Sequence, residues 1–294
     1  MTATARYIHH PPALWSLYGR AIIPKGTTSG KAPEAIPALT AELLGVRTNG
    51  ERLHRYRKLC GFANHSWVPV TWPHLLAFPL HMRLLTDEGF PLPLLGLVHL
   101  RNRIVQQRPI KEGECLDILC RLANSNKTDK GLEFDIVTEA LSAGQVVWTE
   151  HSTTLFRQPS NSAASAKSAD RKPELARYSH KLHLEAPSDT GRRYGKLSGD
   201  LNPIHLYALT ARAFGFRRAI AHGMWSKASC IALLERQTQW PGGAIDVQTA
   251  FKKPLFLPGN ALLNWREDKH AWPFQLLNAK GDTPHLTGHV EFLD

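Results

Sequence analysis

The sequence has little of what secreted, disulfide-linked or membrane-spanning proteins need. Only four of its 294 residues are cysteines, and none of them forms a Cys-x-x-Cys pair. We therefore expect free thiols in a reducing cytosol rather than a disulfide framework or a zinc site of the usual spacing. No apolar run reaches the roughly 18 residues of a membrane span, and the N-terminal stretch lacks the apolar segment of a secretory signal. The expectation is a cytoplasmic protein with no membrane span.

Acidic residues are also in the minority. Twenty-five Asp and Glu residues stand against 36 Lys and Arg residues, which gives a formal net charge of +11. Such a charge suits nucleic acid, an anionic membrane surface, or an acidic ligand or carrier. The basic residues are scattered and no nucleic-acid-binding motif accompanies them, so we expect no nucleic acid partner. The length fits two domains of ordinary size, and 43% hydrophobic residues are enough for a sizeable core.

One ordered stretch, from Tyr194 to His205, carries the candidate chemistry. Asn202 is a favoured helix N-cap and the proline after it is favoured at the first helical position. We therefore predict a helix over residues 203–214, with His205 in its first turn. Asp200 precedes this helix, where the helix dipole favours an ionised carboxylate. The pattern predicts an acid/base pair at one helix N-terminus.

A second stretch, Ala221 to Met224, begins a helix that we predict over residues 223–240. The first N–H groups of a helix have no partner within the helix, and they point toward any bound anion. Gly223 has no side chain, so a substrate oxygen could approach its N–H closely. The pattern indicates an oxyanion site at the start of the second helix.

Together the two stretches resemble the hydratase 2 motif of MaoC-like (R)-specific enoyl-CoA hydratases and 3-hydroxyacyl-thioester dehydratases. The matching residues are Tyr194, Leu197, Ser198, Gly199, Asp200, Asn202, Pro203 and His205, followed by Ala221, His222, Gly223 and Met224. The resemblance implies a hydro-lyase that interconverts trans-2-enoyl and (R)-3-hydroxyacyl thioesters. It makes Asp200 and His205 the catalytic dyad and Gly223 the oxyanion-hole residue.

The resemblance also implies supporting roles. Asn202 would help to hold the dyad and a water molecule, and Tyr194, Ser198 and His222 are candidates for positioning the substrate. The thioester carrier would be coenzyme A or an acyl carrier protein, with no metal and no redox cofactor. Four basic residues are candidates for contacts with carrier phosphates, although a solvated surface also explains them: Arg217, Arg218, Lys252 and Lys253.

The first half of the chain echoes the second. Residues 56–64 repeat the Tyr, Lys, Leu, Gly and Asn of residues 194–202 in order, 138 positions earlier, and residues 108–113 echo 253–259. Two echoes at similar spacing predict an internal duplication. Phe62 stands where Asp200 stands, and Trp67 where His205 stands. We expect this degenerate copy to keep the fold and to contribute a binding wall without catalysis.

The expected architecture is an α+β double hot-dog fold, in which each copy wraps an antiparallel sheet around one long helix. Its boundaries are predicted at residues 1–158 for the degenerate copy, 159–174 for a linker and 175–294 for the catalytic copy. A chain with two copies already imitates a dimer of single ones, so both a monomer and a homodimer are expected states.

Two other functions stay open at this point. A hot-dog acyl thioesterase usually has a carboxylate on its central helix, and the predicted helix offers only Glu235, near its end. A non-catalytic acyl-binding protein is opposed by the intact Asp200 and His205. The sequence leaves open the acyl chain, the carrier, the favoured direction and which member of the dyad moves which proton. A weak preference for long or bulky acyl groups follows from the degenerate copy.

Overall fold

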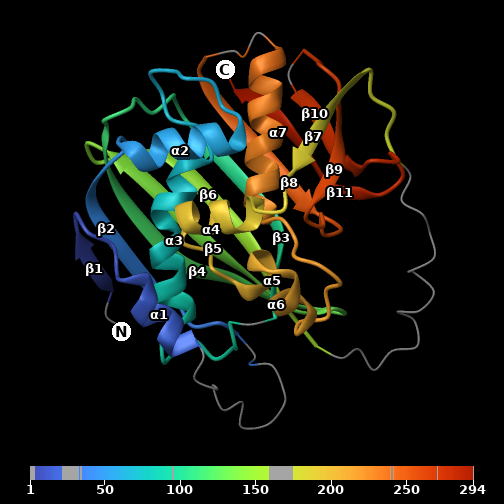
Figure 1. The fold of residues 1–294 in the computed structure, drawn as a ribbon. Coiled ribbons are helices and arrows are strands. Elements are labelled where there is room, and N and C mark those ends of the chain that lie inside the picture. Colours follow the sequence, from blue (N-terminus) through green and yellow to red (C-terminus); the bar gives the residue numbers. More distant parts are fainter. Residues whose placement is uncertain are drawn as a thin grey trace.

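The computed structural model of the chain describes residues 4–21, 33, 35–94, 96–158, 175–238, 240, 242–269 and 271–293. The strands are β1 (Ala5–Ile8), β2 (Thr40–Arg47), β3 (Leu97–Gln106), β4 (Cys115–Thr128), β5 (Gly131–Ser142), β6 (Gln145–Arg157), β7 (His180–Ala186), β8 (Ala244–Phe251), β9 (Gly259–Trp265), β10 (Ala271–Asn278) and β11 (Pro284–Leu293). The helices are α1 (Leu14–Ala21), α2 (Glu51–Cys60), α3 (Trp72–Leu85), α4 (Thr190–Ser198), α5 (Pro203–Leu206), α6 (Ala208–Arg212) and α7 (Gly223–Gln237). The strands form one 11-stranded sheet, and the helices lie on one face of it (Figure 1).

The sheet repeats itself about a central seam. Its strand order is β1-β2-β4-β5-β6-β3-β8-β11-β10-β9-β7, and β3 pairs with β8 in antiparallel fashion. The order β2-β4-β5-β6-β3 therefore recurs in reverse as β8-β11-β10-β9-β7, and each set of five strands has one long helix. This arrangement confirms the expected α+β double hot-dog fold. The boundaries at 158 and 175 stay a prediction, and the predicted linker lies outside the described residues.

The two long helices, α3 and α7, fill the space inside the sheet. Twelve of the 14 residues of α3 and ten of the 15 residues of α7 are buried. A helix that is buried on nearly all sides needs no polar stripe, and small residues in α7 such as Ala228 and Ala232 let the sheet approach closely. The helix α7 begins at Gly223 as predicted. It ends at Gln237 rather than at residue 240, because Thr238 adopts an extended conformation (φ −124°, ψ 166°).

The predicted helix over residues 203–214 is wrong in its length. The structure has two short helices there, α5 and α6, because Tyr207 between them is extended (φ −142°, ψ 152°). The hydroxyl of Thr210 donates to the Pro203 carbonyl at 2.6 Å and ties the two helices together. Asn202 caps α5 as predicted, since its side-chain oxygen accepts a hydrogen bond from the Ile204 N–H. His205 lies in the first turn, also as predicted.

The structure changes one of the two residue equivalences that we expected between the degenerate copy and the second copy. Gly61 and Gly199 both end a helix in the left-handed conformation, so Phe62 does take the place of Asp200. Trp67, however, forms an isolated bridge with Lys111, whereas Ile220 forms the matching bridge with Phe256. Trp67 therefore takes the place of Ile220, not of His205. The stretch that carries α5 and α6 in the second copy has no helical counterpart between residues 62 and 71.

Two expectations from composition can be compared with the structure. No helix in the described ranges is long and apolar enough to span a membrane. The four cysteines are free, and only Cys115 is exposed.

Candidate active site

The predicted catalytic carboxylate stands at the end of α4. Gly199 ends this helix with a φ of +87°, a conformation that favours glycine. A Cβ atom at Gly199 would also lie only 2.5 Å from the Leu14 side chain. Asp200 follows directly, and its own N–H donates to the hydroxyl of Ser198 at 3.1 Å. The Asn202 N–H donates to the Asp200 carboxylate, also at 3.1 Å. Ser198 and Asn202 therefore shape the turn that presents Asp200.

Three titratable side chains meet at this turn. Ligand atoms of Asp200, His205 and His222 all lie within 4.8 Å of one another. The rings of His205 and His222 stack with centroids 3.7 Å apart. The His222 Nε2 atom lies 3.0 Å from the Asp200 carbonyl oxygen and 3.8 Å from its carboxylate. The structure thus brings together the predicted dyad and adds His222, which the sequence suggested only as a positioning residue.

Hydrogen bonding and burial together determine the protonation state of the two imidazole rings. His205 Nδ1 lies 2.8 Å from the Ile220 carbonyl, which can only accept, so Nδ1 carries the proton and Nε2 keeps a lone pair. Burial lowers the pKa of His205, although the neighbouring Asp200 opposes this effect. Burial, together with His205, lowers the pKa of His222 to about 3. Both rings are therefore neutral near pH 7.

Asp200, in contrast, is ionised. Burial alone would raise the pKa of its carboxyl group, but His222, His205 and the Asn202 N–H outweigh that effect and lower it. The side chain keeps 30% of its surface exposed, whereas His222 keeps 3%. A partly exposed carboxylate beside a neutral imidazole can accept a proton from a substrate and later return the proton, as acid–base catalysis requires.

Gly223, the predicted oxyanion-hole residue, is the first residue of α7 and follows His222, the N-cap. Its N–H therefore has no partner within the helix. A Cβ atom at this position would lie 3.0 Å from the ring of Phe251, so a side chain would crowd the start of the helix. Gly223 directly follows His222, one of the two stacked histidines. The role of its N–H as the oxyanion donor stays a prediction.

Tyr194 lies deeper than a substrate contact would. Its ring is 4.9 Å from His222 and 6.4 Å from Tyr56, and its hydroxyl is buried with no partner in the described residues. In the first copy, the Tyr56 hydroxyl shares a 2.7 Å hydrogen bond with Thr71, the N-cap of α3. Tyr194 and His222 are the corresponding pair in the second copy. The arrangement supports a packing role under the site.

One further residue of the site, Tyr18 in α1, is not indicated by any sequence pattern. Its hydroxyl donates to the Gly199 carbonyl at 2.8 Å and accepts from the Leu201 N–H at 2.6 Å. These two bonds bracket Asp200. Tyr18 is far from the motif along the chain, and residues near it carry no catalytic pattern. Only the folded arrangement reveals it.

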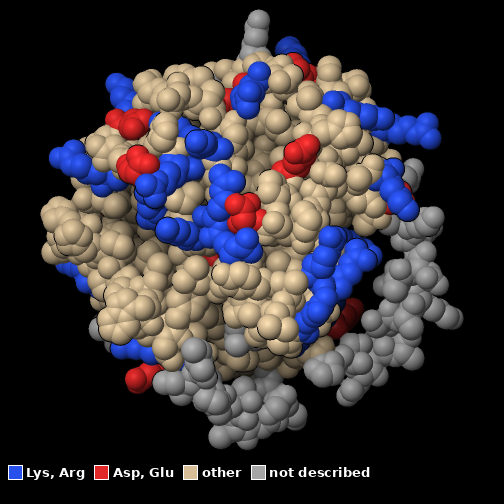
Figure 2. Space-filling model, viewed as in Figure 1, with Lys and Arg blue, Asp and Glu red and all other residues tan. Residues whose placement is uncertain are grey.

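The four candidate carrier contacts lie on two neighbouring loops. The guanidinium groups of Arg217 and Arg218 stand 4.4 Å and 5.7 Å from the centre of the Phe256 ring. The loop of Phe256 also contains the exposed Lys252 and Lys253. Figure 2 shows further lysine and arginine side chains gathered over α2 and α4. Phosphate binding by these cations stays a prediction.

The structure is a double hot-dog fold with an Asp/His cluster before the second long helix, α7. A profile of the MaoC like domain matches residues 165–261, which cover the motif. Over 261 residues the chain is 34% identical to 3-hydroxyacyl-thioester dehydratase X of Mycobacterium tuberculosis, with 88% of this chain and 91% of that protein covered. The chain therefore belongs to the MaoC-like dehydratase family.

Solved structures agree with this assignment. The crystal structure of HtdX from Mycobacterium tuberculosis superposes with a TM-score of 0.74 at 30% identity, covering 86% of this chain and all of that one. A MaoC-like dehydratase from Phytophthora capsici superposes with a TM-score of 0.71 at 15% identity, covering 88% and 96%. The second similarity shows the shared fold alone.

Proposed function

We propose that this protein catalyses the reversible interconversion of a trans-2-enoyl thioester and an (R)-3-hydroxyacyl thioester. The observation that carries the proposal is the convergence of Asp200 and His205, whose ligand atoms lie within 4.8 Å beside the start of α7. The 34% identity to a 3-hydroxyacyl-thioester dehydratase supports the same reaction.

In the hydration direction, a water molecule held by Asp200 and His205 adds to C3 of the enoyl group. The base accepts a proton from this water as the C3–O bond forms, and the electrons of the double bond move toward the thioester carbonyl. The neutral His205 and the ionised Asp200 hold no spare acidic proton between them. The proton taken from water therefore returns to C2, and the pair acts as one proton shuttle with shared titration.

The enolate-like oxygen that forms at the thioester carbonyl needs a donor. The Gly223 N–H at the start of α7 suits this task, because it has no partner within the helix and the helix dipole adds to it. Such a donor typically contributes about 10²–10³-fold to the rate. The mechanism uses no metal and no redox cofactor.

The carrier is coenzyme A or an acyl carrier protein. Both present phosphate groups, and Arg217, Arg218, Lys252 and Lys253 are the residues that would meet them. A cation held against an aromatic ring, as Arg217 is against Phe256, keeps its charge near the surface at a fixed place.

The decisive experiment follows enoyl absorbance and free thiol together, over a series of trans-2-enoyl-CoA chain lengths. We expect absorbance to fall without thiol release, and chiral analysis to find the (R)-product. Asp200→Asn and His205→Ala should each lower kcat by about 10²–10⁴-fold. Matched controls are Asp189→Asn, whose side chain makes no capping bond, and His183→Ala, on the exposed face of β7.

Two results would contradict the proposal. Release of thiol by the wild-type protein would indicate the thioesterase, with Glu235 as the carboxylate to test next. A protein that binds acyl-CoA but turns over none of the chain lengths would be an acyl-binding protein. In that case Asp200→Asn should leave the binding of acyl-CoA unchanged.

A further inference from the structure

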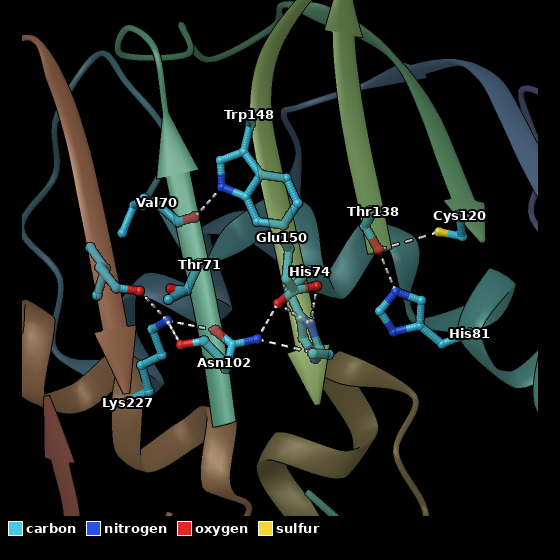
Figure 3. Close-up of polar contacts among 12 residues, drawn as sticks. Val70, Thr71, His74, His81, Asn102, Cys120, Thr138, Trp148, Glu150 and Lys227 are labelled. Atoms are coloured by element: carbon cyan, nitrogen blue, oxygen red, sulfur yellow. Dashed lines mark hydrogen bonds and ion pairs between the residues drawn. The ribbon is translucent and has the colours of Figure 1, made fainter. Parts of the chain in front are cut away.

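Three side chains of the kinds that bind metals meet inside the degenerate copy (Figure 3). His74 and His81 belong to α3, and Glu150 belongs to β6. Each offers a ring nitrogen or a carboxylate oxygen, and these ligand atoms all lie within 4.8 Å of one another. All three side chains are buried, and Glu150 is completely enclosed. Two imidazoles with one carboxylate are a donor set that binds zinc in proteins.

The two histidines converge although they stand two turns apart on α3. Seven residues of a regular helix rise about 10.5 Å along its axis. The ring centres of His74 and His81 are nevertheless only 5.4 Å apart, so both side chains turn toward a common point. The carboxylate of Glu150 reaches the same point, since it lies 2.8 Å from His74 Nδ1. Three ligands from two separate elements thus meet in one place.

The helix that carries both histidines contains a proline between them. Pro79 has no N–H, so the Leu75 carbonyl lacks its usual helical partner. Arg52 of α2 donates to that carbonyl instead, at 2.9 Å. The helix therefore continues past the proline, and both histidines are held by one regular element. Sites on such elements are more precise than sites on loops.

The distances within the group fit a small cation. Zinc bound to four donor atoms at about 2.0–2.1 Å keeps the atoms of different residues about 3.4 Å apart. The observed separations range from 2.8 Å to no more than 4.8 Å, so side-chain shifts of about 1 Å would complete the site. Both oxygens of Glu150 face His74, at 2.8 Å and 3.0 Å from Nδ1. The carboxylate can therefore supply two donor atoms, and the histidines supply one each.

The protonation states of two of the ligands also suit a metal. The hydroxyl of Thr138 lies 2.7 Å from His81 Nε2 and can accept the proton of that nitrogen, which leaves a lone pair on Nδ1. Burial lowers the pKa of His81 to about 3, so its ring is neutral at pH 7. Burial raises the pKa of the Glu150 carboxyl group, but its neighbours, His74 first, outweigh burial and lower the pKa to about 2. A neutral imidazole and an ionised carboxylate are the forms that bind metals.

A second layer of hydrogen bonds holds the carboxylate in place. Asn102 of β3 donates from Nδ2 to Glu150 at 2.6 Å. The side-chain oxygen of Asn102 accepts a 2.5 Å hydrogen bond from Lys227 of α7, which also donates to the Val247 carbonyl at 3.0 Å. The amide is thereby fixed in the orientation that donates to Glu150. Carboxylates that bind metals are usually held by outer hydrogen bonds of this kind, and here the outer layer reaches across the seam into the second copy.

We propose that His74, His81 and Glu150 bind one zinc ion, which the chain encloses as it folds. An ionised carboxylate in a buried place is costly unless a cation compensates its charge, and a divalent ion does so directly. Because all three side chains are buried, the ion has a structural role. The reaction proposed above still uses no metal. The degenerate copy thus keeps a metal centre where it has no acid/base pair.

The test measures zinc per chain by mass spectrometry, in protein produced in medium with added zinc and then dialysed against a chelator. The chelator should remove any ion from the group of Asp200, His205 and His222, because Asp200 keeps 30% of its side chain exposed. It should not reach the enclosed ion. We expect about one zinc ion per chain in the wild type, and a loss of about tenfold or more in His81→Gln. The measurement uses no substrate, so it is independent of the proposed function.

Two control variants should keep the zinc. His99→Gln changes another histidine, on β3, which packs against Phe251 and lies outside the group of three. His205→Ala destroys the other grouping of possible ligands, in the active site. Wild-type protein without zinc would overturn the inference, as would zinc retained by folded His81→Gln or zinc lost in His205→Ala.

A second measurement does not depend on whether His81→Gln folds. The His205→Ala protein is produced with cobalt in place of zinc, and its visible spectrum is recorded after the same dialysis. Four-coordinate cobalt absorbs visible light strongly, whereas six-coordinate cobalt absorbs weakly. We expect the strong absorption of a four-coordinate ion. Weak absorption, or none, would overturn the inference and leave the proposed function untouched.

Discussion

His205 and His222 stack face to face at 3.7 Å, with 27° between their planes, and both donate their N–H to backbone carbonyls. Protonation of either ring would place a positive charge against its neighbour in a buried site. The stack therefore favours two neutral rings. It also orients His205, because its Nδ1–H is committed to Ile220 and only Nε2 is left for a substrate proton.

The first prediction concerns the stability of the fold in acid. The pKa of His222 is about 3 in the folded protein and ordinarily 6.5, so the unfolded chain binds its proton first. Below pH 6.5 the unfolded state is therefore favoured increasingly, until the folded pKa is reached. We expect the free energy of unfolding to fall between pH 6.5 and pH 4 in urea titrations. His222→Gln should show a shallower fall, and an equally steep one would contradict the assignment.

Much of the site was predictable because its residues lie close together in the sequence. The N-cap Asn202, the first-turn His205 and the helix start at Gly223 follow from local rules for helix ends. The fold followed from the motif and from the two echoes, since a repeated sequence predicts a repeated unit.

What local patterns could not supply were contacts between distant segments. Tyr18 and Gly199 are 181 residues apart, and His74 and Glu150 are 76 apart. The break at Tyr207 was also missed, because no glycine or proline marks it. The equivalence of Trp67 with His205 failed because a constant offset ignores the extra α5–α6 segment of the second copy.

The second prediction is that Tyr18→Phe impairs catalysis more than folding. The hydroxyl bonds to Gly199 and Leu201 and holds the backbone on both sides of Asp200. Its loss should cost about 1–2 kcal/mol of stability and lower kcat about tenfold or more through misplacement of the carboxylate. Steady-state kinetics and thermal unfolding measure the two effects. Tyr178→Phe, in a partly exposed segment before β7, is the control. A variant with the wild-type kcat would show that α1 does not fix the turn.

The third prediction concerns Lys227, whose ammonium group is buried at the seam (Figure 3). Burial lowers its pKa from 10.5 to about 7, although Glu150 and Asp246 oppose the effect. The unfolded chain binds the proton more tightly, so stability should rise as the pH increases from 7 toward 10.5. Relative to Lys227→Met, we expect the wild type to gain up to about 2 kcal/mol between pH 7.5 and pH 9. Parallel pH dependence of the two proteins would contradict a depressed pKa.

The last prediction separates acid–base chemistry from metal chemistry. Asp200, His205 and His222 bring their ligand atoms within 4.8 Å, a grouping that also suits a divalent cation. The proposed shuttle requires His205 Nε2 to be free, because a bound metal would occupy its lone pair. We therefore expect kcat to be unchanged after dialysis against a chelator, and added zinc to inhibit by blocking that nitrogen. Loss of activity on chelation, with recovery on adding one metal equivalent, would replace the shuttle with a metal-bound water.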